Sequence, residues 1–196
     1  MIYDKYISEI NNYWFRGSLD YQRWFMSGKK YDKEIKDKFQ DVLKQAEQGN
    51  LEHWANTIDG FIAYIILLDQ FSRQIYRDTH KAYQNDNKAM KFTRKHIIKY
   101  IDDLTAVQVL FVLMPFEHSE NIQDQKDGIK TIKTLIKFET DKDELKILNN
   151  TLTYMKDHYK VLKRFGRFPK RNKVIKGRNS TPEELEYINS TKELPY

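Results

Sequence analysis

One stretch of the sequence combines side chains that could do acid–base or metal chemistry. His118 is followed by Glu120 and, one helical turn later, by Asp124. This spacing could place three ligands around a hard divalent ion, and the histidine alone could act as a general base. The structural alternative is a histidine and acids that cap a helix and complement its dipole. The stretch therefore predicts either a reaction centre or an ordinary helix start.

A second candidate is Asp69, which follows eight consecutive apolar residues. An unpaired carboxylate in such surroundings is costly to desolvate, so Asp69 needs a partner. Arg73 follows one helical turn later, and an Asp69–Arg73 ion pair is available on one helix face. Either this pair fastens helices together, or Asp69 orients a histidine or arginine from another segment toward a ligand.

A third candidate is the basic bend at residues 165–172. Gly166 permits a left-handed backbone and Pro169 prevents the helix from continuing, so Arg167 and Arg171 project from a fixed turn. Arginines held in this way suit bidentate recognition of phosphate or carboxylate. The alternative is a basic turn whose arginines satisfy helix carbonyls and pair with acids of the chain.

The positive charge of the chain is concentrated around this bend. The formal net charge of the 196 residues is +6, whereas residues 156–178 alone carry ten basic side chains and one acid. The remainder is mildly acidic. The charge therefore favours a local anion site over a generally basic protein that seeks nucleic acid.

Composition excludes several classes of protein. The chain has no cysteine, which excludes disulfide frameworks, thiol nucleophiles and cysteine-ligated zinc. Its longest apolar runs are eight residues, well short of the ~20 that a membrane-spanning helix requires. Acids and lysines occupy the N-terminal residues where an export signal would be apolar. We therefore expect a soluble cytoplasmic protein without membrane contact.

Helices must position these residues, because the sequence has the apolar periodicity of helices. Apolar side chains recur at three- and four-residue spacing, and no segment shows sustained strand alternation. Helices are predicted over residues 31–48, 58–76, 85–100, 105–113, 119–138 and 143–166, and another from Thr181. The pattern predicts a single all-α domain over residues 1–196, with about eight or nine helices packed as antiparallel pairs.

Particular residues mark where these helices begin and end. Pro115 is expected to end one helix, and Ser119 to cap the next, which turns Ile122 inward. Thr181 and Glu184 form a capping-box pattern at the last helix.

Four segments together resemble a known family. They are LLDQFSRQIYR at residues 67–77, MPFEHSE at 114–120, FGRFPKRN at 165–172 and GRNSTPEE at 177–184. Their order and separations resemble the family catalogued as domain of unknown function nine-two-four, over nearly the whole chain. The resemblance implies tetratricopeptide-like helical hairpins coiled into a right-handed superhelix. It brings no activity, because none is established for the family.

The chain departs from the family pattern at two positions. Ser72 stands where the family usually has proline, and Lys170 where it usually has histidine. If a histidine at the second position did chemistry, the lysine can offer only charge. This departure weighs against catalysis.

The polar positions of the matching motifs make one candidate site, since a superhelix could bring them into one cleft. We assign His118 and Asp69 as candidate catalytic residues. The candidate ligand-binding residues are Gln70, Arg73, Glu120, His158, Arg167, Arg171 and Asn172. No metal and no cofactor is assigned.

Three functions compete on these observations. The leading interpretation is a binding protein that takes a small anionic ligand, bearing phosphate or carboxylate, in a cleft lined by His, Asp and Arg. The second is a hydrolase in which His118 activates water and arginines hold the developing negative charge, with or without a metal ion. The third is a scaffold for a protein partner or nucleic acid. Nucleic acid is less favoured, because Tyr159, Phe165 and Phe168 have spacings that suit packing rather than base stacking.

Overall fold

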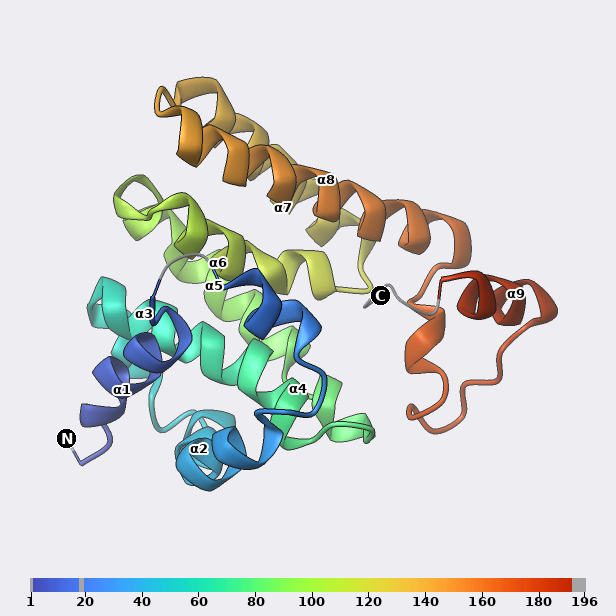
Figure 1. The fold of residues 1–196 in the computed structure, drawn as a ribbon, viewed down its shortest axis with the longest axis horizontal. Helices are drawn as coiled ribbons and strands as arrows, with labels where there is room; N and C mark the ends of the chain where they lie inside the picture. The colour runs from blue at the N-terminus through green and yellow to red at the C-terminus, as the bar shows by residue number, and fades with distance from the viewer. Residues whose placement is uncertain (1, 18–19, 192–196) are drawn as a thin grey trace. The chain divides into compact units, whose positions relative to one another are not determined.

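The protein folds as helices joined by short connections. The structure, a computed structural model, describes residues 2–17 and 20–191. Over these residues it contains helices and turns but no β-strand, which confirms the predicted all-α class. None of the helices in this part of the chain is long and apolar enough to cross a membrane. The α-helices are α1 (Lys5–Trp14), α2 (Asp32–Glu47), α3 (Ile58–Ile65), α4 (Ser72–Ile75), α5 (Asp86–Tyr100), α6 (Ala106–His118), α7 (Ile122–Phe138), α8 (Lys142–Phe165) and α9 (Pro182–Ser190) (Figure 1).

Contacts divide the chain into two compact units, with the dividing point inside α6. The first unit comprises residues 1–77 and 81–115, and the second comprises residues 78–80 and 116–196. The single domain and the right-handed superhelix therefore stay predictions, whereas each unit can be described by itself.

The first unit is built around the expected central helix at residues 58–76. This stretch consists of α3, a wider π-helical turn at Ile66–Phe71, and α4. Side chains 61–68 are buried to within 1% exposure. Asp69 lies in the π-helical turn, a local geometry that is frequent at functional sites.

Aromatic side chains close the core of the first unit. The ring of Phe111 lies 5.3 Å from that of Trp14 and 4.9 Å from that of Trp24, both in edge-to-face geometry. Such contacts add to the area that the rings bury. They fix the part of α6 that belongs to the first unit against the N-terminal segment.

The prediction that Pro115 ends its helix is wrong. Helix α6 continues through Pro115 to His118. Proline costs one backbone hydrogen bond and crowds the preceding turn. Phe116 and Glu117 are nevertheless 3% and 4% exposed, and burial of this last turn offsets the cost of the proline.

The prediction that Ser119 caps the next helix is also wrong. Asn121 caps α7 through its side chain, which accepts a hydrogen bond from the backbone N–H of Gln123. The Ser119 hydroxyl instead donates to Asp124 at 2.6 Å. Because α7 begins later than expected, Ile122 lies in its first turn and is 36% exposed rather than inward.

Helices α7 and α8 form the main hairpin of the second unit. Figure 1 shows them side by side and antiparallel. Gly128 on α7 permits the close approach, since a Cβ there would lie 2.6 Å from Met155 Cε on α8. Gly166 ends α8 in a left-handed conformation, and α9 begins with the predicted Thr181–Glu184 capping box. The bend at residues 165–172 is thus held between two well-defined helix ends.

Candidate active site

Asp69 lies in the first unit and has the partner that the sequence predicted. Its carboxylate is fully buried and accepts a hydrogen bond of 2.5 Å from Gln70 Nε2. Arg73 Nη2 lies 3.6 Å from Asp69 Oδ1, which confirms the expected ion pair. Gln70 Nε2 also contacts the sulfur of Met114 at 3.1 Å.

The guanidinium of Arg73 is occupied by groups of the first unit. Its Nη1 donates to Asp86 Oδ1 at 2.8 Å and to the Ala82 carbonyl at 2.5 Å. Burial alone lowers the pKa of Arg73, but the carboxylates of Asp86 and Asp69 raise it overall. Arg73 is therefore a permanent cation between two buried acids. This is the arrangement expected of an ion pair that fastens helices.

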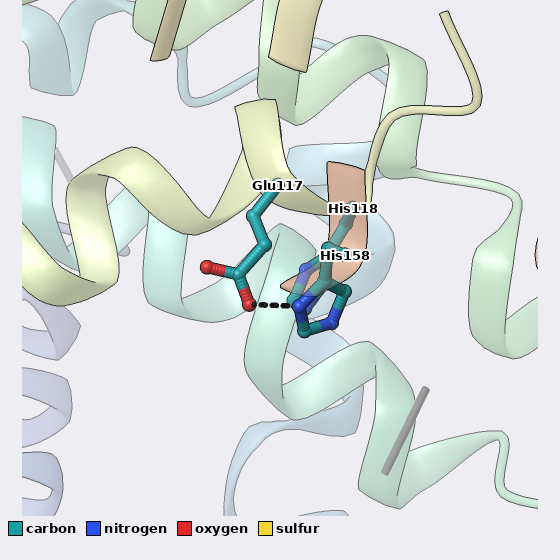
Figure 2. Close-up of side chains that lie close together, drawn as sticks. All are labelled: Glu117, His118 and His158. Carbon is teal, nitrogen blue, oxygen red and sulfur yellow. Dashed lines mark ion pairs between the residues drawn. The ribbon is translucent and has the colours of Figure 1, made fainter. Parts of the chain in front are cut away.

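A second cluster, formed by Glu117, His118 and His158, lies in the second unit. The first two residues end α6, and His158 projects from the middle of α8. Each offers one ligand atom, and these atoms lie within 4.8 Å of one another. Glu117 Oε1 is 3.1 Å from His158 Nδ1, as Figure 2 shows by the dashed line. Glu117 and His158 are buried, whereas His118 is half-buried.

The contacts of His158 define which ring nitrogen carries its proton. Nδ1 lies 3.0 Å from the carbonyl oxygen of Tyr154 and 3.1 Å from Glu117 Oε1. A carbonyl oxygen and a carboxylate oxygen both accept hydrogen bonds, so Nδ1 must be the donor. In the neutral ring the lone pair is then on Nε2. A histidine oriented in this way by a carboxylate can take a proton or bind a metal ion through Nε2.

Residues of the basic bend pack against this cluster. The ring of Phe168 packs edge-to-face on His158, with centroids 5.7 Å apart. Arg171 stacks over Phe168 at 4.6 Å and donates from Nη2 to the carbonyl of His118 at 2.9 Å. The bend therefore fixes the two histidines and adds a positive charge beside them.

Glu120 and Asp124, which spacing alone could place around a metal ion with His118, bond to other groups of the chain. Glu120 accepts hydrogen bonds from Arg178 at 2.8 and 2.5 Å and from the backbone N–H of Phe168 at 2.8 Å. Burial raises the pKa of Glu120, but the hydrogen bonds from Arg178 and Phe168 lower it overall. Among the described residues, the ligand atoms that converge belong to Glu117, His118 and His158, not to His118, Glu120 and Asp124.

Arg167 is likewise bonded within the chain. Its Nε and Nη2 donate to the two carboxylate oxygens of Glu184 at 2.6 and 2.8 Å, and Nη2 also donates to the Asn179 carbonyl. Asn172 Nδ2 donates to the Ser180 hydroxyl at 3.1 Å. These contacts tie the bend to the start of α9 and match the structural alternative for the basic turn.

The Arg167–Glu184 pair predicts a specific pH dependence of stability. The hydrogen bond from Arg167 lowers the pKa of Glu184 from 4.5 to about 2, although burial acts in the opposite direction. A carboxylate with a depressed pKa stabilises the fold above its unfolded pKa, and this contribution is lost as the pH falls toward its folded pKa. We therefore expect the difference in Tm between wild type and Glu184→Gln to be largest near neutral pH and to shrink between about pH 5 and pH 2.

Thermal unfolding followed by circular dichroism across this pH range checks the prediction. The matched control is Glu183→Gln, which removes the neighbouring carboxylate from a pair with Arg164 whose side chains are more than half exposed. Its Tm difference should be small throughout. A Glu184→Gln difference that stays constant from neutral pH to pH 2 would contradict the assignment.

Lys170 occupies the position where the family usually has histidine. Its Nζ donates to the backbone carbonyl of Thr191, and burial lowers its pKa. The lysine thus anchors the end of α9.

The predicted site residues are distributed over the two units. The second unit holds His118, Glu120, His158, Arg167, Arg171 and Asn172, whereas the first holds Asp69, Gln70 and Arg73. A cleft shared by all nine stays a prediction. Sequence reasoning missed Glu117, although it directly follows the apolar run that ends at Phe116. Glu117, like Asp69, is a carboxylate at the end of an apolar run, where burial without a partner is costly.

Comparison with known proteins gives a family and a fold. A family model described as "Bacterial protein of unknown function (DUF924)" matches residues 10–192. A solved structure of the protein of unknown function ATU0120 from Agrobacterium tumefaciens is similar, with a TM-score of 0.82 and 26% sequence identity. The match covers 96% of this chain and 99% of that one. A search of curated protein sequences finds no match.

Proposed function

The chain belongs to the DUF924 family of bacterial proteins of unknown function, and we propose that it is a hydrolase centred on Glu117, His118 and His158. The observation that supports the proposal is that their three ligand atoms lie within 4.8 Å of one another. Polar atoms hydrogen-bond a water oxygen at about 2.9 Å. Atoms this close together can therefore share one water molecule.

The carboxylate of Glu117 orients the base of the proposed reaction. It accepts the Nδ1–H of His158 at 3.1 Å, together with the Tyr154 carbonyl at 3.0 Å, and leaves Nε2 with a lone pair. Nε2 takes a proton from the water while the water oxygen forms a bond to the carbonyl carbon or phosphorus of an ester. The ester bond to the leaving group then breaks, and the imidazolium returns the proton to that group.

Arg171 supports an anionic substrate. Its guanidinium is held over Phe168 and beside the His118 carbonyl, so a positive charge adjoins the cluster. A fixed cation stabilises the negative charge that develops on the attacked group. Hydrolysis of a phosphate- or carboxylate-bearing ester agrees better with these contacts than does binding by Arg73 or Arg167, whose guanidinium groups already contact carboxylates.

The close approach of the ligand atoms of Glu117, His118 and His158 also favours a second possibility, a bound divalent metal ion. Two histidines and one carboxylate are a common donor set for zinc and other transition-metal ions. The ion would lower the pKa of its bound water and so produce the nucleophile.

The test is a hydrolysis assay of the purified chain with chromogenic carboxylic esters, phosphate monoesters and phosphate diesters. Each substrate is assayed in EDTA and again with added Mg²⁺, Mn²⁺ or Zn²⁺. We expect turnover of one ester class. Turnover that persists in EDTA would show that the histidine base activates the water without a metal ion. Turnover that requires an added ion would show that a metal centre activates it.

The variant that tests the cluster in this assay is Glu117→Gln, which keeps the size of the side chain and removes its charge. Its turnover should fall under the condition that supports the wild type. The proposal would be wrong if no substrate is hydrolysed under any condition and calorimetry detects no binding of a metal ion.

A further inference from the structure

A basic groove runs between α7 and α8, apart from the histidine cluster. It encloses about 470 Å³, and four of the residues that line it are the α7 lysines Lys126, Lys130, Lys133 and Lys137. Lys156 on α8 is a fifth lysine in the lining, which includes no acidic side chain. The groove therefore concentrates five positive charges within one hairpin of the second unit.

These lysines differ from several on α2 in having no ion-pair partners. On α2, for example, Lys38 binds Glu34 at 2.9 Å and Lys44 binds Asp41 at 3.0 Å. None of the five groove lysines has an ion pair with any residue that the structure describes. Their charges are uncompensated locally, so they can attract an anion.

The spacing of the lysines favours an elongated ligand. The four on α7 recur at intervals of four, three and four residues, which keeps them on one face of the helix. At 1.5 Å per residue, Lys126 and Lys137 are about 16 Å apart along the helix axis. A single phosphate would contact one or two of these lysines, whereas a chain of phosphates could contact the whole row.

An aromatic side chain lies between the charges. Tyr159 on α8 and Ile129 on α7 line the groove, and both are half-buried. The sequence spacing suggested that Tyr159 packs in the interior, but its ring pairs with no other aromatic ring among the described residues. Proteins that bind single strands combine a basic groove that follows the backbone with aromatic rings on which bases stack.

We propose that the α7–α8 groove binds single-stranded nucleic acid, with the five lysines on its phosphates and Tyr159 against a base. Stacking on Tyr159 requires an unpaired base, so a single strand should bind more tightly than a duplex. This site replaces the basic segment around the bend as the place for nucleic acid, because Arg167 in the bend is already bonded to Glu184, and Arg178 after the bend is bonded to Glu120.

The experiment is fluorescence anisotropy with a labelled single-stranded RNA of mixed sequence and the full-length chain. Binding is measured at several salt concentrations from about 50 mM upward. With four or five phosphates contacted, the plot of log affinity against log salt should have a slope of about −3. An unlabelled duplex and inorganic polyphosphate serve as competitors.

Two matched variants test the location of the site. Lys130→Glu with Lys133→Glu reverses two charges in the groove and should weaken binding by at least about tenfold at low salt. Lys91→Glu with Lys95→Glu makes the same change of net charge on exposed positions of α5, outside the groove, and should change affinity less than twofold. Circular dichroism verifies that both variants are folded.

Tyr159→Ala tests the stacking contact. Loss of one stacked base should weaken binding to the single strand by about tenfold. Affinity that is equal for Tyr159→Ala and wild type, or for duplex and single strand, overturns the proposal in favour of a site for phosphate chains alone. Equal losses in the two lysine variants, or no binding by the wild type, also overturn it. The readout is binding, so it is independent of whether the histidine cluster hydrolyses an ester.

Discussion

Replacing His158 by asparagine is expected to lower kcat by about 10²–10⁴-fold on the ester that the wild type hydrolyses. The ring of His158 is held by Glu117 at 3.1 Å and by the Tyr154 carbonyl at 3.0 Å, with Phe168 packed against it. Asparagine retains a polar group but cannot take up the proton of the water. Steady-state kinetics measure the loss.

The matched control for this substitution is His80→Asn. His80 is an exposed residue of the second unit and lies outside the cluster. Its replacement should leave kcat unchanged. If His158→Asn is folded by circular dichroism and turns over substrate at the wild-type rate, His158 is not the base.

Replacing Arg73 by alanine is expected to lower the free energy of unfolding by about 3 kcal/mol, because removing one partner of a buried pair leaves the other charge uncompensated. Arg73 lies between Asp86 at 2.8 Å and the fully buried Asp69 at 3.6 Å. Without it, Asp69 and Asp86 would lose the guanidinium that contacts both of them. Urea unfolding followed by fluorescence of the three tryptophans measures the change.

An exposed ion pair provides the comparison for Arg73. Arg164 binds Glu183 at 2.8 Å, but their side chains are 55% and 58% exposed. Arg164→Ala should therefore cost less than about 1 kcal/mol. Equal losses from the two substitutions would show that Arg73 does not hold the buried acids as described.

The sequence predicted the helices better than their ends near the site. Apolar periodicity is local, and so the amphipathic stretch at 31–48 appears as α2 and the apolar stretch at 58–76 as the buried centre of the first unit. The Thr181–Glu184 capping box also depends on neighbouring residues and forms as predicted. Pro115 and Ser119 were misjudged because tertiary burial of Phe116 and Glu117 decides where α6 ends.

The candidate site was predictable only in part. The Asp69–Arg73 pair lies within one helical stretch, so its spacing was sufficient. The contact between Glu117 and His158 joins positions 41 residues apart, and no local pattern specifies it. The same is true of the Glu120–Arg178 pair. Spacing alone suggested Glu120 as a metal ligand, but its carboxylate binds Arg178 instead.

The most direct measurement of the central claim is a ¹⁵N NMR spectrum of the imidazole of His158 in the neutral state, assigned with the His158→Asn variant. We expect a proton on Nδ1 and a lone pair on Nε2, because Nδ1 faces two oxygens that accept hydrogen bonds. Weakening of the Nδ1–H hydrogen bond in Glu117→Gln would agree with this arrangement. A proton on Nε2 in the wild type would contradict it, since the lone pair would then be on Nδ1, which faces the Tyr154 carbonyl and Glu117, and Nε2 could not take a proton from water.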